Sequence, residues 1–254
     1  MAQNGLLARL EEQRLILEAI SRGEYCCLRH GLPYVTPSIL ASQAVCERKA
    51  VYELLESRYK PVASDAKQLV KIVLQTKSKL PRTLPGYFSL DTPLAAIVQG
   101  VPVIGRPHSI VFVNGVVSAI IVGKRTNRPE RLYLSDRVKL YTYGLLASRA
   151  GFPLGSRTRL VLVAARTNND LVEAVKHVYK WLRNGASLPP RDKRFTIHFM
   201  AHDESVEEET LAPLLAYWRG EREEHAEPGP WCNRCPLSSS CPSFRRRLGE
   251  EYYQ

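Results

Sequence analysis

Hydrophobic residues in the first third of the chain recur at the spacing of α-helices. Residues 5–21 carry charges on one side and an apolar stripe on the other, so they predict an amphipathic helix. The stripe consists of Leu6, Leu10, Leu17 and Ile20. Thr36, followed by a proline, offers an N-cap for a second helix over 37–59 that contains Cys46. A third helix is expected over 65–78.

The middle of the chain changes to the period of strands. Short apolar runs at Ala95–Val98 and Val101–Ile104, and then at Ser109–Val113 and Val116–Val122, predict a β-meander of three or four strands. The second pair flanks Asn114-Gly115, a dipeptide that favours a type I′ hairpin turn. Helical and strand patterns alternate after that. Helices are expected over 135–150, 169–183 and 207–220, and strands over 159–165 and 195–200.

Length and composition favour one α/β domain with additions at both ends. The 254 residues are 44% hydrophobic, which is ample for a large core. We divide them into an N-terminal helical region over 1–60, a core over 61–225 and a cysteine-bearing segment over 226–254. No stretch approaches the ~18 uninterrupted apolar residues of a membrane span, and the first 25 residues do not resemble a signal peptide. A cytoplasmic protein without membrane contact is therefore expected.

The charge balance indicates an anionic partner. The formal net charge is +11, and 25 of the 36 basic residues are arginine. Because arginine grips phosphate with two hydrogen bonds and keeps its charge, nucleic acid is a better candidate than a membrane surface. The alternative interpretation is the arginine-rich surface of a thermophile protein.

Six cysteines occupy the two ends of the chain: Cys26, Cys27, Cys46, Cys232, Cys235 and Cys241. The last three have the spacing C-x2-C-x5-C, in which a tight loop directs two thiolates at one metal and the third returns to it. Zinc and iron–sulfur centres normally have four ligands, so Cys46 is expected as the fourth, with Cys26 or Cys27 as alternatives. Unrelated surface thiols are the remaining interpretation.

These motifs resemble a known family. Ser38-x7-Cys46-Glu-Arg-Lys49, the central strands and the terminal cysteine triplet are similar to the RecB-like exonucleases that carry an iron–sulfur cluster. Within that group they look most like the CRISPR-associated exonuclease family of the spacer-acquisition machinery, over residues 36–245. The resemblance implies a PD-(D/E)xK (restriction-endonuclease-like) core and a role in antiviral defence or DNA repair. It also implies a [4Fe-4S] cluster, with zinc as the competing metal. Its ligands would be Cys46, Cys232, Cys235 and Cys241.

The catalytic motif of that family is degenerate here. Family members hold a divalent metal with an Asp on one strand and the Glu of an E-x-K on the next, and the Lys positions the attacking water. His108 stands at the Asp position, Val122 stands 14 residues later at the Glu position, and only Lys124 is retained. Since Mg²⁺ and Mn²⁺ require anionic oxygens, no active-site metal is expected. Three carboxylates could substitute as displaced ligands: Asp91, Glu130 and Asp136.

A cationic cleft would remain where the nuclease site was. The side chains expected to bind nucleic acid there are Lys71, Lys124, Arg125, Arg128, Lys139 and Tyr143, with Arg131 and Arg137 at the rim. Ordinary surface charges are the competing interpretation. The preferred hypothesis is a catalytically inactive, DNA-binding subunit of a nucleic-acid-processing complex. The alternatives are a metal-dependent DNA exonuclease with displaced ligands and an unrelated zinc-stabilised nucleic-acid-binding protein.

Overall fold

The structure is a computed structural model that describes residues 3–25, 28–56, 61–81, 83–184, 192–226, 229–239 and 241. The α-helices are α1 (Gln3–Ser21), α2 (Pro37–Gln43), α3 (Glu47–Glu56), α4 (Ala63–Ser78), α5 (Leu134–Arg149), α6 (Asn168–Asn184) and α7 (Glu204–Trp218). The strands are β1 (Tyr87–Leu90), β2 (Leu94–Val98), β3 (Val101–Gly105), β4 (Ser109–Val113), β5 (Val116–Arg125), β6 (Leu154–Ala165) and β7 (Phe195–Ala201). Two short 3-10 helices are η1 (Arg29–Gly31) and η2 (Pro230–Arg234). None of the described helices is both long and apolar enough to cross a membrane.

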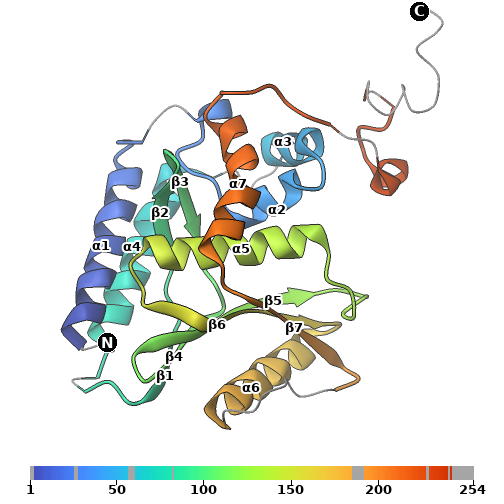
Figure 1. The fold of residues 1–254 in the computed structure, drawn as a ribbon. Coiled ribbons are helices and arrows are strands. Elements are labelled where there is room, and N and C mark those ends of the chain that lie inside the picture. Colours follow the sequence, from blue (N-terminus) through green and yellow to red (C-terminus); the bar gives the residue numbers. More distant parts are fainter. Residues whose placement is uncertain are drawn as a thin grey trace, which may run out of the picture.

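The chain has a mixed α/β fold around a five-stranded sheet. The strand order is β1-β4-β5-β6-β7; β5 and β6 are parallel, and the other neighbours are antiparallel. The β4–β5 hairpin turns at Asn114 and Gly115, whose φ angles of 50° and 78° are those of the predicted type I′ turn. Between the parallel strands the chain crosses over through α5. Figure 1 shows α5 along one face of the sheet and α6 against the other.

Alternation along the strands separates the interior into two cores. Ile120 belongs to the larger core on the α5 side, whereas Ile121 belongs to a smaller core beneath α6. Because successive side chains of a strand point to opposite faces, Val122 and Lys124 lie on the α5 side of β5. This places Val122 and Lys124, two of the three candidate catalytic positions, on the face that α2 and α5 cover.

A separate two-stranded sheet, β2–β3, joins the N-terminal helices to the larger core. The backbone N–H of Ala95 in β2 donates a 2.6 Å hydrogen bond to the buried Gln13 side chain of α1. At the end of β3, a side chain on Gly105 would meet Pro37 at 2.6 Å and Tyr143 at 2.7 Å. Glycine at this position therefore allows α2 and α5 to approach the hairpin closely.

Most of the elements expected from the sequence are confirmed. The helices predicted over 5–21, 65–78, 135–150, 169–183 and 207–220 correspond to α1, α4, α5, α6 and α7. The predicted strands correspond to β2 through β7, but the strand at the edge of the main sheet, β1, was not expected.

The helix predicted over 37–59 is wrong. Thr36 caps it as expected, because its side chain accepts a hydrogen bond from the N–H of Ile39. The helix then ends at Gln43, and a new helix begins at Glu47. Gln43 and Glu47 are buried and accept hydrogen bonds from Trp218 and Arg222, which lie far along the chain, so tertiary contacts override the continuous helical pattern. Cys46 lies at the start of α3 instead of inside a helix.

The predicted meander is also wrong, because its two hairpins belong to different sheets. β2 pairs only with β3, whereas β4 pairs with β5 and with β1. Residues 94–96 and all of β3 are buried, so their apolar runs carry no alternation that would assign them to a sheet face.

Candidate functional site

A pocket of about 250 Å³ opens between β5, α2 and the first turns of α5. It brings together three residues of the degenerate motif and predicted cleft: Val122, Lys124 and Lys139. Its polar lining consists of Ser38, Ser42, Lys124, Ser135, Asp136 and Lys139. The serines were not predicted, because nothing in the sequence distinguishes them from other helix-terminal serines.

His108 stands at the start of β4, beside this pocket. Its N–H donates to the carbonyl of Ile121 at 2.8 Å, and its Nδ1 accepts a hydrogen bond from the N–H of Gly123 at 2.9 Å. The accepting Nδ1 leaves the ring proton on Nε2. Burial, with the charge of Lys139 adding to it, lowers the pKa of His108 and favours the neutral ring. A side chain at residue 123 would lie 2.8 Å from the imidazole, so this contact requires glycine.

Lys124 is paired with Asp136. Its ammonium donates to Oδ1 at 2.7 Å and to Oδ2 at 2.8 Å, and it lies 4.9 Å from the centre of the Tyr133 ring. The Asp136 side chain is only 6% exposed, and its Oδ2 also accepts the backbone N–H of Tyr133 at the start of α5. Asp136 therefore neutralises Lys124 and caps a helix at the same time.

Lys139 is a second cation in the same pocket, one turn along α5. Within the described part of the chain its ammonium has no hydrogen bond or ion pair. Burial lowers the pKa of Lys139; the charge of Asp136 opposes this shift, and the charge of Lys124 adds to it. Asp136 is the one carboxylate among the described residues that line this pocket, and it is paired with Lys124. The positive charge of Lys139 therefore has no carboxylate partner there.

The other predicted cleft residues lie outside this pocket's described lining. Arg125 and Arg128 are exposed at the end of β5 and beyond it, and Lys71 is exposed on α4. Tyr143 is only 5% exposed, and its hydroxyl donates to the carbonyl of Arg106 at 3.0 Å. The expectation that Tyr143 binds nucleic acid is therefore wrong, because its ring fills the core between α5 and β3.

The proposed substitute carboxylates are dispersed. Asp91 forms an exposed ion pair with Arg106 at 2.7 Å, and Glu130 is exposed in the loop after β5. Asp136 alone of the three lines the pocket, and both of its oxygens are occupied.

The four cysteines expected to hold the cofactor lie together. Cys46, Cys232, Cys235 and Cys241 line one small pocket, although the first is about 190 residues from the others along the chain. The pocket is completed by Arg48, Lys49, Trp231, Leu237 and Ser238. Cys26 and Cys27, the alternative ligands, lie outside the described residues.

Backbone N–H groups approach two of these thiols. Cys46 directly precedes α3, and its sulfur accepts a hydrogen bond from the N–H of Lys49 in the first turn. Burial raises the pKa of Cys46, and the neighbouring C-terminal thiols add to that, whereas the Lys49 N–H lowers it. On the other side, Gly229 donates its N–H to Cys232 Sγ at 3.3 Å. Such donors stabilise thiolates, which are the forms that bind metals.

The donor set fits a metal cofactor in its chemistry. Four thiolates ligate either a zinc ion or a [4Fe-4S] cluster. The space between the side chains is about 20 Å³, which admits one atom-sized guest, so a cluster would require the thiols to move apart. As the described side chains stand, no group of three or more Cys, His, Asp or Glu has a metal-ligating arrangement. The thiols share a pocket without converging on one point.

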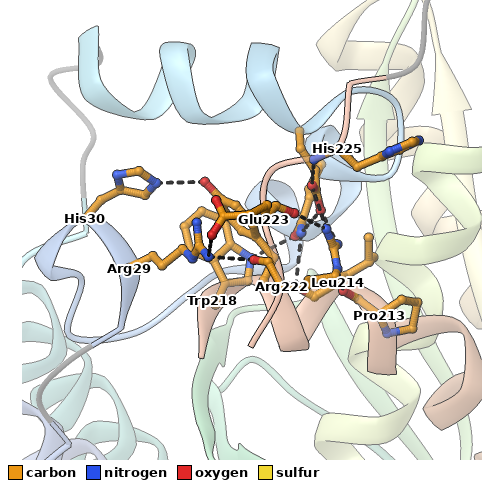
Figure 2. Close-up of polar contacts among 11 residues, drawn as sticks. Arg29, His30, Pro213, Leu214, Trp218, Arg222, Glu223 and His225 are labelled. Atoms are coloured by element: carbon orange, nitrogen blue, oxygen red, sulfur yellow. Dashed lines mark hydrogen bonds and ion pairs between the residues drawn. The ribbon is translucent and has the colours of Figure 1, made fainter. Parts of the chain in front are cut away.

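A buried polar network lies next to Cys46 and was not predicted. Figure 2 shows Arg222 and His225, from the segment after α7, reaching toward α2 and α3. At its centre the Glu47 carboxylate accepts hydrogen bonds from Gln43 at 2.7 Å, from Arg222 at 2.9 Å and from the N–H of His225 at 2.6 Å. Trp218 donates to Gln43 at 2.7 Å. In the sequence, this network shows itself only in Glu47, a glutamate that directly follows the candidate ligand Cys46.

Comparison with known proteins adds little. No protein-family model matches the chain, and no curated protein matches it significantly. A solved structure described as "Crystal structure of SSO0001" is similar over 90% of this chain and 95% of its own, with 14% identity and a TM-score of 0.38. A likeness at that level carries no argument about function.

Proposed function

We propose that this chain is an iron–sulfur protein of the RecB-like nuclease type whose nuclease site binds DNA without a divalent metal and without cutting it. The cofactor is a [4Fe-4S] cluster, with zinc as the alternative. The chain serves as a subunit of a CRISPR-type or DNA-repair-type complex. The observation that carries this proposal is the meeting of four cysteines from both ends of the chain at one pocket.

The strand arrangement supports the nuclease part of the proposal. The resemblance places the two metal-binding positions on neighbouring strands, and His108 and Val122 lie at the start of β4 and on β5, which are paired. The retained Lys124 lies on the same side of β5 as Val122 and lines the same pocket. A PD-(D/E)xK site would hold its metal at this place.

The side chains present favour an anion over a metal ion. Val122 is apolar and 2% exposed, and His108 uses one ring nitrogen on the backbone of Gly123. The single carboxylate is bonded to Lys124, and Lys139 contributes an uncompensated positive charge. A phosphate oxygen finds an ammonium and three serine hydroxyls here, whereas Mg²⁺ would find one occupied carboxylate.

The test is DNA binding in EDTA. We expect duplex and single-stranded oligonucleotides to bind at low salt, with an affinity that falls steeply as salt rises. Lys139→Glu should weaken binding about tenfold or more, since it replaces the free cation of the pocket. Lys176→Glu, on the exposed surface of α6, changes the net charge equally and should have a much smaller effect. Equal losses of DNA affinity in both variants would mean that binding depends on net charge and not on this pocket.

The cofactor is tested on anaerobically purified protein. Iron, sulfide and zinc contents, with the absorbance near ~400 nm, separate a brown [4Fe-4S] protein from a colourless zinc protein. A chain that carries neither metal when it is purified under reducing conditions contradicts the proposal.

The presence of Asp136 in the pocket favours one second candidate, a Mn²⁺-dependent exonuclease with a displaced ligand. Cleavage of DNA by the wild type with Mn²⁺, abolished by Asp136→Asn, would establish that activity and overturn the inactive site.

A further inference from the structure

We infer that Glu47 and Arg222 are positioning residues of the cysteine site: their ion pair ties the chain ahead of Cys232 to the residue next to Cys46. The thiols from the two ends of the chain then meet before any cofactor binds. This inference rests on the proposed function in taking the four cysteines as one ligand set, and it does not depend on which metal they hold.

The first step of the argument is that Glu47 is fully engaged. It is the first residue of α3 and is 4% exposed. The two terminal guanidinium nitrogens of Arg222 bind the two Glu47 oxygens, one of them at 2.9 Å, which is the bidentate geometry preferred by arginine and carboxylate. Gln43 and the N–H of His225 occupy the remaining acceptor positions. The residue adjacent to Cys46 is therefore fixed by three residues from two segments, α2 and residues 222–225.

The second step is that Arg222 is itself held in place. Its Nε donates to the carbonyl of Pro213 inside α7 at 2.8 Å, and its guanidinium lies 5.7 Å from the centre of the Tyr217 ring. Arg29 donates to the backbone carbonyl of Arg222 at 2.6 Å, as Figure 2 shows. The Arg222 side chain is thus held by contacts with both helices and links α7 to α3.

A second ion pair lies beside the first, one residue after Glu47 and two residues after Arg222. Arg48, which follows Glu47, contacts Glu224 at 2.6 Å. Arg48 also lines the cysteine pocket, and hydrogen bonds to Glu224 and then to Cys241 raise its pKa. The segment 222–225 is therefore tied to the start of α3 at consecutive positions.

The consequence is a short tether for the C-terminal cysteines. Cys232 lies seven residues beyond the last anchor, His225, and can be at most about 24 Å from it. Without the anchors the free chain would begin at Trp218, fourteen residues before Cys232. Because effective concentration falls roughly as the −3/2 power of tether length, doubling the tether lowers the encounter rate of the thiols about threefold.

The experiment measures thiol proximity directly. The full chain, carrying Cys26→Ser and Cys27→Ser, is freed of metal with a chelator and treated with dibromobimane, which joins two nearby thiols and becomes fluorescent. Peptide mapping identifies cross-links between Cys46 and the C-terminal cysteines. We expect rapid cross-linking in this parent protein and cross-linking slowed by up to about threefold in Glu47→Ala and Arg222→Ala, because threefold corresponds to the loss of every anchor and the Arg48–Glu224 pair remains in both variants.

Controls separate positioning from general stability. Glu208→Gln removes an ion pair between α7 and Arg149 of α5 and should cross-link at the parent rate. Arg222→Lys keeps the charge but loses the bidentate geometry, and its rate should lie between those of the parent and Arg222→Ala. The double variant with both alanines should be no slower than the slower single variant. Circular dichroism confirms that each variant is folded, and Arg222→Ala, at a partly exposed position, serves if Glu47→Ala does not fold.

The outcomes distinguish this inference from the proposed function. Parent-like cross-linking in both alanine variants, or none to Cys46 in the parent, overturns the positioning role even if the purified protein contains iron or zinc. Slower cross-linking in the variants of a protein that contains neither metal supports the positioning role and contradicts the cofactor. On the protein as purified, the alanine variants should also lose their metal to a chelator faster than the parent, by up to about threefold.

Discussion

Lys124 donates hydrogen bonds to both carboxylate oxygens of Asp136, so the lysine that the resemblance assigns to the nuclease motif is bound to the first turn of α5. In the family that the sequence resembles, that lysine positions a water molecule. In this chain Lys124 neutralises Asp136, whose side chain is 6% exposed. Asp136 also caps the start of α5. The pair therefore supports the fold, and Lys139 remains as the cation available to a ligand.

Removing Asp136 should destabilise the protein. Asp136→Ala leaves the Lys124 ammonium without its partner and the N–H of Tyr133 without its acceptor, so we expect the free energy of unfolding to fall by about 3 kcal/mol. Asp170→Ala at the start of α6 removes an exposed contact with Thr167 and should cost about 1 kcal/mol or less. Urea denaturation measures both, and equal losses would contradict the buried role of Asp136.

The same aspartate should weaken DNA binding in the wild type. Asp136→Asn keeps an oxygen for the Tyr133 N–H but frees the charge of Lys124, so we expect a higher affinity for DNA and a steeper dependence on salt. Fluorescence anisotropy in EDTA measures this change. Asp170→Asn adds the same unit of charge outside the pocket and serves as its control. An unchanged affinity in Asp136→Asn would place the DNA elsewhere on the surface.

A pH-dependent contribution to stability is expected from His202 and Glu207. His202 Nδ1 lies 2.8 Å from the fully buried Glu207 carboxylate, and this hydrogen bond raises the pKa of His202. Burial raises the pKa of Glu207 as well. The two groups share one proton, and the folded state holds it more tightly than a free histidine does. Its stabilising contribution is complete below the ordinary histidine value of 6.5 and is lost as pH rises through the raised value.

The free energy of unfolding should therefore fall as pH rises above about 6.5, and Glu207→Gln should flatten that slope. Thr210→Ala, on the same helix and without a titrating group, should leave the slope as it is. Urea denaturation at a series of pH values measures it. A wild-type stability that rises over this range would mean that the pair is not protonated as described.

The sequence predicts local structure well here and long-range structure poorly. The Asn114-Gly115 turn and the stripe of α1 follow from short-range rules, and both are present. The break at Cys46 was missed because it depends on Gln43 and Trp218, which are far apart in the sequence. A helical period cannot register such a contact.

The candidate site was likewise predictable where local spacing decides and not where residues far apart in the sequence meet. The C-x2-C-x5-C spacing predicted that the three C-terminal thiols lie together, and the need for a fourth ligand pointed to Cys46, which lines the same pocket. The polar pocket was only partly predictable: Lys124 and Lys139 were singled out, but the pairing of Lys124 with Asp136 was not. Tyr143 was assigned to the cleft together with the cations around it, and its burial follows from the close approach at Gly105.

Loss of one cysteine should affect both colour and stability. The cofactor would close a loop of about 190 residues, so its binding contributes to folding. Cys232→Ala should give a protein without absorbance near ~400 nm and with a lower melting temperature. Cys26→Ser with Cys27→Ser should keep both properties. If that control loses its colour and Cys46→Ser does not, one of the adjacent pair is the fourth ligand.

Restoring the two missing carboxylates should restore metal-dependent chemistry. His108 adjoins the backbone of β5 at Gly123, and Val122 lines the pocket with Lys124 beside it. We expect the wild type to be inactive on DNA with Mn²⁺ and the double variant, His108→Asp with Val122→Glu, to cleave weakly. Neither single change should suffice, because one carboxylate holds the ion poorly.

The cleavage should be weak for a structural reason. Lys124 remains tied to Asp136, so the lysine is displaced from the position in which it would orient water, and small misplacements cost orders of magnitude in rate. Adding Asp136→Asn to the double variant should therefore raise the rate by releasing Lys124, although it lowers stability. The matched control, His108→Asn with Val122→Gln, has the same size and no charge and should stay inactive. Mn²⁺-dependent cleavage by that control or by the wild type would contradict the placement of the metal at these two positions.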